Sequence, residues 1–172
     1  MGMGPSRGRR PLVVVSQPNT ADPDGWKRLD SAPEDVAQSV RQVFRKQFPH
    51  VSLCKDEEII RKKWNYPDSA IRILATYGSN KGSLLIETDL NDGGCTYVDD
   101  PNDPGSAPWF LVTQDGQIRR IGSFMTLLDA GDYDNDGMSE LIFQYNRPED
   151  IDGFLLFDAK LHKRAEILWT YH

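Results

Sequence analysis

Hydrophobic residues recur at helical spacing in one stretch near the start of the chain. These apolar positions are Val36, Val40, Val43, Phe44 and Phe48. Because residues three or four apart share one face of a helix, the pattern predicts an amphipathic helix whose apolar stripe packs on a sheet. Ser31 and Glu34 have the spacing of a capping box, and Pro49 cannot continue a helix, so we expect the helix to lie between them. Pro33 would stand in the first turn, where a missing N–H is tolerated.

From residue 70 onward, apolar residues fall in short runs that are rich in β-branched and aromatic side chains. Turn residues separate these runs, a pattern typical of strands joined by tight turns. The predicted strands cover residues 71–77, 83–88, 109–113, 117–121, 141–145, 153–158 and 166–171. Short connections such as Gly78-Ser79-Asn80-Lys81-Gly82 predict three successive hairpins. We therefore expect a mainly β (α+β) fold: an antiparallel hairpin or meander sheet with one flanking N-terminal helix, preceded by a short strand at residues 12–16.

Length and composition indicate one folded domain. The chain has 172 residues, of which 38% are hydrophobic and 27% charged, which suits a globular protein with a sizeable core. Residues 1–10 are rich in glycine and arginine and are expected to be disordered, so the predicted domain spans residues 11–172. The net charge of −6 argues against a nucleic-acid partner, because phosphate binding needs concentrated positive charge.

Three features of the sequence bear on the cellular compartment. No run approaches the roughly 20 apolar residues needed to cross a bilayer, so we expect no transmembrane segment. The apolar run after Arg9-Arg10 is shorter than the about 7–15 residues of a secretory signal, so we expect no signal peptide in this chain. Two cysteines, Cys54 and Cys95, form an even count that suits an oxidising compartment. A disulfide between them would be worth about 4 kcal/mol in the chain-entropy model, and two independent buried thiols are an equal alternative.

The most informative segment is Asp132–Glu140. Acidic side chains occupy positions 1, 3, 5 and 9 of this segment, and Gly137 at position 6 permits a sharp turn. Calcium binds six to eight oxygen atoms at about 2.3–2.6 Å, and carboxylates held together repel one another without a cation. The spacing therefore predicts a calcium loop, against the alternative of an acidic, solvated turn without metal. The predicted ligands are oxygen atoms of Asp132, Asp134, Asp136, Met138 and Glu140.

The loop differs from the helix-loop-helix calcium motif. In that motif a glutamate at position 12 closes the site, and here that position is Phe143. Residues 141–145 are β-branched and aromatic, so they predict a strand rather than an exiting helix. The pattern Asp-x-Asp-x-Asp-Gly-x-x-Glu leading into an apolar strand resembles the FG-GAP and VCBS-type repeat of integrin-like β-propellers and bacterial surface proteins.

The resemblance covers about one repeat, residues 123–171. It implies that calcium binds at the five predicted ligands, the one at Met138 being its main-chain carbonyl. Glu140 stands where the family more often has aspartate, so it would bind the ion directly or through water. A weak internal echo between the segments that begin at Ser69 and Ser139 suggests blade-like units in a small sheet. Two such units are fewer than a full propeller requires.

As the resemblance implies, we expect a non-catalytic calcium-binding module for interaction or adhesion, with calcium in a structural role. It would act outside the cell or in the cell envelope. Its partner would be a protein or glycan surface ligand, or copies of itself. The alternative is a self-assembling structural protein of a filament or surface layer, in which hairpin edges pair between subunits.

Catalytic signatures are sparse in the sequence. No histidine has a second histidine at metal-ligand spacing, and a phosphate-binding glycine loop is absent, so we expect no enzyme activity. Glu149, Asp150 and Asp152 could form a carboxylate-rich cleft with the aspartate loop. Paired carboxylates of that kind hydrolyse glycosidic bonds, which makes a carboxylate-dependent hydrolase the least favoured alternative.

Overall fold

The computed structural model describes residues 21–55, 58–90, 101–148 and 151–170. In these residues the chain forms one α-helix, one short 3-10 helix and eleven strands. In chain order they are β1 (Lys27–Leu29), α1 (Glu34–Gln47), β2 (Leu53–Lys55), β3 (Glu58–Arg61), η1 (Asp68–Ala70), β4 (Ile71–Gly78), β5 (Leu84–Leu90), β6 (Trp109–Val112), β7 (Ile118–Gly122), β8 (Met125–Gly131), β9 (Glu140–Arg147), β10 (Ile151–Phe157) and β11 (Lys163–Thr170). The predicted mainly β (α+β) fold is confirmed.

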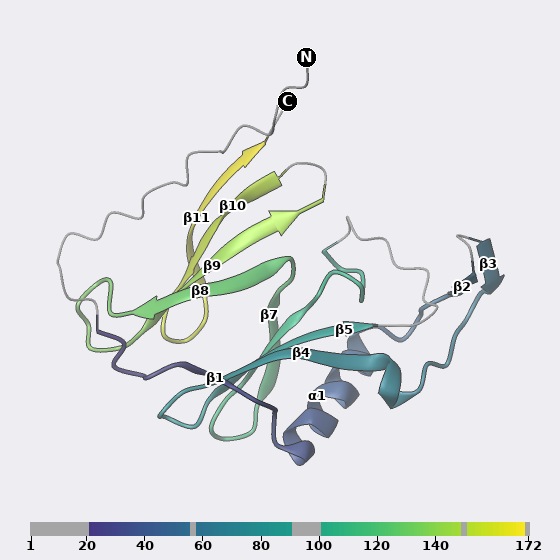
Figure 1. The fold of residues 1–172 in the computed structure, drawn as a ribbon, viewed down its shortest axis with the longest axis horizontal. Coiled ribbons are helices and arrows are strands. Elements are labelled where there is room, and N and C mark those ends of the chain that lie inside the picture. The colour runs from purple at the N-terminus through teal and green to yellow at the C-terminus, as the bar shows by residue number, and fades with distance from the viewer. Residues whose placement is uncertain (1–20, 56–57, 91–100, 149–150, 171–172) are drawn as a thin grey trace.

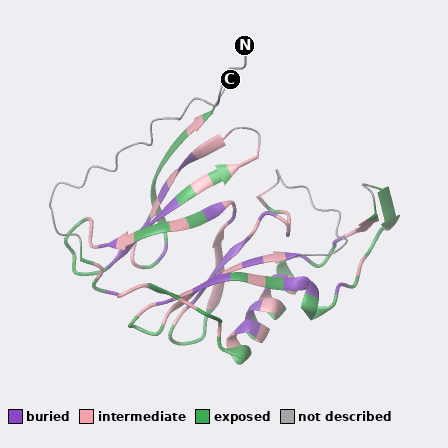
Figure 2. Ribbon diagram, viewed as in Figure 1, coloured by how far each residue is buried: buried purple, intermediate pink, exposed green. Residues whose placement is uncertain are grey.

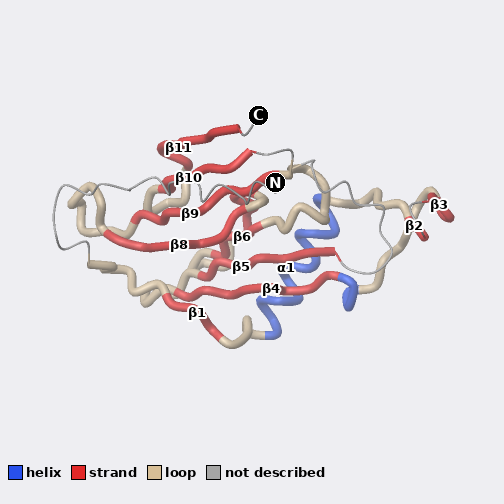
Figure 3. Tube along the Cα trace, turned by 45° about the horizontal axis from the view of Figure 1, so that its top comes forward, coloured by secondary structure: helices blue, strands red, loops and turns tan. Residues whose placement is uncertain are grey.

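The strands form two large antiparallel sheets and one small one (Figure 1). The five-stranded sheet has the order β1-β4-β5-β6-β7, and the four-stranded sheet has the order β11-β10-β9-β8. The pairings β4–β5, β6–β7 and β9–β10 confirm the three predicted hairpins. Strands β2 and β3 pair with each other as a separate two-stranded sheet and project to one side of the molecule in both views (Figures 1 and 3).

The expectation of one small sheet is wrong, because strands β8 to β11, within residues 125–170, form a sheet of their own. That sheet contains β8, a strand that the hydrophobic pattern does not predict. The register between β8 and β9 shifts between Leu127 and Asp129, so β8 does not keep the strict alternation of a regular strand. Its residues 126–130 are therefore partly or fully exposed, and only its two ends are buried.

The five-stranded sheet lies between two hydrophobic cores. Helix α1 covers one face with Val40, Phe44 and Phe48, and the four-stranded sheet covers the other face. Neighbouring residues of β5 and β6 point to opposite faces, so Leu85 belongs to one core and Ile86 to the other. Buried residues accordingly follow the middle of both large sheets, whereas the β2–β3 hairpin is largely exposed (Figure 2).

Trp109 on β6 is the largest fully buried side chain and connects the two sheets. Its indole N–H donates a hydrogen bond to the Met125 carbonyl of β8 at 2.9 Å. Its ring stacks on Tyr77 of β4 at 5.9 Å between centroids and meets the edge of Phe143 of β9 at 5.3 Å. Arg119 of β7 adds a second link, because its guanidinium donates to the carbonyl of Leu161 beside β11 at 3.0 Å.

Helix α1 begins differently from the prediction. Pro33 is its N-cap residue, without a side-chain cap hydrogen bond, and the Pro33 carbonyl accepts a bond from the Ala37 N–H at 2.9 Å. Ser31 lies two residues before this N-cap, so the predicted capping box with Glu34 does not form. Acidic residues in the first turn and basic residues in the last turn complement the helix dipole instead. The helix ends before Pro49, as predicted.

Four other expectations fall wholly or partly beyond the residues that the structure describes. The predicted strand at residues 12–16 and the predicted disorder of residues 1–10 lie outside them. Within the described ranges, no helix is both long and apolar enough to cross a membrane. The predicted single domain over residues 11–172 stays a prediction.

Replacing Trp109 with phenylalanine tests how strongly the two sheets depend on this side chain. We expect W109F to lower the free energy of unfolding by about 2–4 kcal/mol, because it leaves a cavity and removes the hydrogen bond to Met125. Urea unfolding at equilibrium measures the change. W169F, on the edge strand β11, should cost less than about 1 kcal/mol. Equal losses in the two variants would contradict the proposed role of Trp109.

Candidate metal centre

The predicted calcium loop is the turn of the hairpin between β8 and β9. Residues 132–139 connect the two strands, and Glu140 is the first residue of β9. The loop therefore leads into a strand, as its sequence predicts. A helix exits from the helix-loop-helix calcium motif at the same point, so this site has a different scaffold.

The structure brings the three predicted aspartates together. One carboxylate oxygen from each of Asp132, Asp134 and Asp136 lies within 4.8 Å of the others, so this cluster can hold a metal ion. The backbone turns through two residues of positive φ, Asn135 at 62° and Gly137 at 82°. Asparagine and glycine tolerate this conformation best, which explains why these residue types stand between the aspartates.

The aspartates also shape the loop by accepting hydrogen bonds from its main chain. The two carboxylate oxygens of Asp132 accept from the N–H groups of Asp136 and Gly137, each at 3.0 Å. An oxygen of Asp136 accepts from the Met138 N–H at 2.8 Å. An ionised carboxylate offers about four acceptor sites, so each aspartate keeps lone pairs that can face a cation.

Glu140 is buried, and only one of its two carboxylate oxygens has a hydrogen-bond partner among the described residues. Its side chain is 4% exposed, and its Oε2 atom accepts a hydrogen bond from the Tyr133 N–H at 2.7 Å. Its Oε1 atom is buried without a hydrogen-bond partner among the described residues. Burial raises the pKa of Glu140; the Tyr133 N–H opposes this, and the nearby charges of Asp134 and Asp136 raise the pKa further.

A buried carboxylate oxygen without a partner costs free energy, and repulsion from Asp134 and Asp136 adds to that cost. A cation near Glu140, Asp134 and Asp136 would give the buried oxygen a partner and would reduce the repulsion among the three carboxylates. The aspartate cluster therefore fits a divalent cation as a set of hard oxygen donors, whereas the Glu140 carboxylate is not among the oxygens that lie within 4.8 Å of one another, so its role as a ligand stays a prediction. The role of the Met138 carbonyl stays a prediction.

Tyr133 closes one side of the loop through a bond to β8. Its hydroxyl donates to an Asp129 carboxylate oxygen at 2.7 Å. Burial raises the pKa of Tyr133 well above its ordinary value, and the Asp129 carboxylate adds to the shift. The phenol therefore stays neutral at physiological pH and acts as a hydrogen-bond donor.

The structure adds two aspartates that the sequence analysis does not place at this site. Asp24 is buried, and its N–H donates to the Ser139 hydroxyl oxygen at 3.0 Å. The Ser139 hydroxyl in turn donates to a carboxylate oxygen of Asp22. The segment Asp22-Pro23-Asp24-Gly25 has the composition of a turn, but nothing in the sequence indicates a partner 115 residues away.

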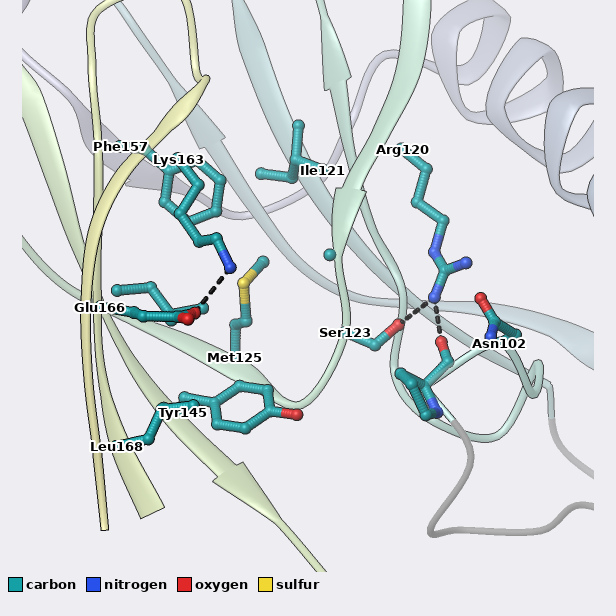
Figure 4. Close-up of a pocket in the computed structure, with 13 residues that line it drawn as sticks. Asn102, Arg120, Ile121, Ser123, Met125, Tyr145, Phe157, Lys163, Glu166 and Leu168 are labelled. Carbon is teal, nitrogen blue, oxygen red and sulfur yellow. Dashed lines mark hydrogen bonds and ion pairs between the residues drawn. The ribbon is translucent and has the colours of Figure 1, made fainter. Parts of the chain in front are cut away.

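A second concave feature lies at the open side between the two sheets (Figure 4). This cavity of about 450 Å³ has apolar walls that include Met125, Tyr145 and Phe157. Lys163 and Glu166 of β11 form an ion pair at 2.6 Å at its border. Among its described lining residues, Glu166 is the single carboxylate, whereas glycoside hydrolysis by paired carboxylates needs two.

Of the other candidate residues, the two that the structure describes, Asp152 and Cys54, lie outside the loop. Asp152 lies on β10, whereas Glu149 and Asp150 are outside the described residues. Cys54 on β2 is disulfide-bonded. Cys95, the other cysteine of the chain, is also outside the described residues.

Comparison of the chain with protein-family models, curated proteins and solved structures finds no match. The resemblance to the FG-GAP and VCBS-type repeat therefore stays a prediction from the loop sequence. The interpretation of the site rests on its own geometry: three converging aspartates beside a buried glutamate.

Two glycines provide a matched test of the loop. Gly137 and Gly116 both have positive φ, 82° and 80°, and a Cβ added at either would meet no atom within 4 Å. When a chelator removes calcium, we expect the free energy of unfolding of both G137A and G116A to be about 1 kcal/mol lower than that of wild type, because each substitution introduces only backbone strain. In excess calcium the loss in G137A should grow while that in G116A stays constant. Thermal unfolding under both conditions measures this, and equal losses in calcium would contradict a cation in the loop.

Proposed function

We propose that the β8–β9 loop binds a calcium ion and that the chain is a non-catalytic interaction or adhesion module stabilised by that ion. The observation that carries this proposal is the buried Oε1 atom of Glu140, which lacks a partner among the described residues and lies in the field of Asp134 and Asp136. The resemblance of the loop to the FG-GAP and VCBS-type repeat supports the same conclusion.

The composition of the site favours calcium over magnesium. Calcium accepts six to eight oxygen ligands in flexible geometry, whereas magnesium needs a near-ideal octahedron and keeps several waters. The loop supplies up to four carboxylates, from Asp132, Asp134, Asp136 and Glu140. The Met138 carbonyl and water would complete the coordination.

The ion would act structurally rather than catalytically. It would offset the repulsion among the carboxylates and supply a partner for the buried Glu140 oxygen. Because calcium binds the folded loop and not the unfolded chain, its binding free energy adds to the stability of the fold. The effect would be largest at the start of β9, since Glu140 is the first residue of that strand.

The exposure of the site suggests where it works. Asp134 and Asp136 are exposed, and open calcium sites of extracellular modules have dissociation constants of about 10⁻⁴–10⁻³ M. Calcium at that concentration is available outside the cell. We therefore infer an extracellular or cell-envelope location, with a protein or glycan as partner.

Calorimetric titration of calcium into the demetallated protein tests the proposal. We expect wild type to bind calcium with a dissociation constant in the micromolar to millimolar range, and D136A to abolish the binding heat. D115A is the control, because Asp115 lies in an exposed turn before Gly116 and outside the aspartate cluster. D115A should bind calcium like wild type. Absence of heat in wild type, with no change in melting temperature, would reduce the loop to an acidic turn.

A second candidate function, self-assembly, is favoured by the exposure of β11. This strand is the edge of the four-stranded sheet, and no other described strand pairs with its free side. Ile167 and Leu168 at its centre are 62% and 45% exposed. Long edge strands with exposed apolar residues pair readily with other chains.

Sedimentation over a range of concentrations separates the two functions. An interaction module should stay monomeric at micromolar concentration. A pairing edge would give larger species as concentration rises, and I167K would dissociate them because it places a charge on the edge. L74K is the control, since Leu74 is 42% exposed on β4, an inner strand of the five-stranded sheet. A monomer at every concentration would exclude self-assembly through β11.

A further inference from the structure

The turn formed by residues 21–25, named here the latch turn, is fastened to the cation loop at several points. The Asp132 N–H donates to the Ala21 carbonyl at 2.9 Å. The Asp24 N–H donates to the Ser139 hydroxyl oxygen, and the Ser139 N–H donates to an Asp24 carboxylate oxygen at 3.4 Å. Asp22 accepts from the Ser139 hydroxyl and also from the Gly25 N–H, which holds the latch turn in shape.

The same turn is fastened to the five-stranded sheet. The Asn80 N–H donates to the Asp24 carbonyl at 2.7 Å, and the Lys81 ammonium forms an ion pair with the Asp24 carboxylate. Asn80 and Lys81 belong to the turn between β4 and β5. Gly25 permits the close approach, since its φ is 62° and a Cβ there would lie 2.0 Å from the Asn80 side chain. The latch turn therefore bridges the two large sheets.

The position of Ser139 makes this bridge relevant to the metal. Ser139 stands between two predicted ligands, Met138 and Glu140, and it is 1% exposed. The latch turn holds both its main-chain N–H and its hydroxyl. A site that is already ordered binds more tightly, because the ligand does not have to offset the lost conformational entropy.

We propose that Asp22, Asp24 and Lys81 are positioning residues of the cation site, so that calcium binding and the docking of the β4–β5 turn are coupled. This inference rests on the proposed calcium site. Coupling between two sites is reciprocal: if docking tightens calcium binding by a given factor, calcium tightens docking by the same factor. Calcium would then brace the two sheets against each other as well as the loop itself.

Lys81→Met provides the sharpest test, because charge and coupling predict opposite results. Removing a positive charge makes the surroundings more negative and by Coulomb's law would tighten calcium binding. Coupling predicts weaker binding, because the buried Asp24 loses its partner and the latch turn is released. We expect calorimetry to show about fivefold weaker calcium binding, at the lower end of typical coupling.

Lys163→Met is the matched control for this substitution. Lys163 is 50% exposed and Lys81 57% exposed, and each forms one ion pair with a carboxylate. Lys163 contacts neither the latch turn nor the loop through any hydrogen bond or ion pair found among the described residues. We expect K163M to bind calcium as wild type does.

Hydrogen exchange at the main-chain N–H of Asn80 gives a second readout. Asn80 lies in the β4–β5 turn of the five-stranded sheet. In wild type we expect calcium to slow exchange at Asn80, because it stabilises the latch turn that accepts this N–H. In D24N and K81M the slowing should be lost. A variant that is destabilised in the α1 core, I86V, should keep it, which separates coupling from general loss of stability.

The outcomes distinguish the two proposals. If wild type binds no calcium, the proposed function fails and the coupling fails with it. A second outcome is that wild type binds calcium, that K81M binds it as tightly or more tightly, and that calcium does not change hydrogen exchange at Asn80. That outcome overturns the coupling and leaves the calcium site in place. Weaker binding in K81M with lost protection of Asn80 supports the coupling.

Discussion

The architecture depends on one constraint: β5 and β6 are buried on both faces. Residues that face α1, such as Ile86 and Phe110, alternate with residues that face the other sheet, such as Leu85 and Trp109. A strand that is apolar on both sides needs a cover on each side. The 14-residue helix α1 covers one face. Strands β8 to β11 cover the other face as a separate four-stranded sheet. The stacking of helix α1, the five-stranded sheet and the four-stranded sheet determines which turns of the two sheets lie close together.

The candidate metal centre lies at such a meeting point. The β8–β9 loop comes from one sheet and the β4–β5 turn from the other, and residues 21–25 connect the two by hydrogen bonds. A turn is also where aspartates can be concentrated without interrupting strand pairing. The repulsion among Asp132, Asp134 and Asp136 is thereby confined to an exposed tip. Glu140 adds a further carboxylate at the buried start of β9, where solvent cannot screen its repulsion from the aspartates.

The sequence predicts the local elements of this protein better than their assembly. Apolar spacing finds α1, and short β-branched and aromatic runs separated by turn residues find the strands of three hairpins, because both patterns depend on near neighbours. The capping box fails because Pro33 takes the N-cap position itself. Strand β8 is missed because its bulge near Leu128 breaks the alternation. The aspartate spacing predicts the convergence of Asp132, Asp134 and Asp136. The contribution of Asp24 is invisible in the sequence, since it depends on how two separate sheets stack.

The contacts of the latch turn have a consequence for the order of events during synthesis. Asp24 leaves the ribosome 115 residues ahead of Ser139, its main hydrogen-bond partner in the loop. At about 5–20 residues per second this interval lasts roughly 6–23 seconds. The local hairpins, which form in about 1–10 microseconds, are complete long before. The latch turn is therefore synthesised early and completes its contacts late: Asp24 can meet Asn80 and Lys81 of the β4–β5 turn first, and Ser139 only after the β8–β9 loop has been made.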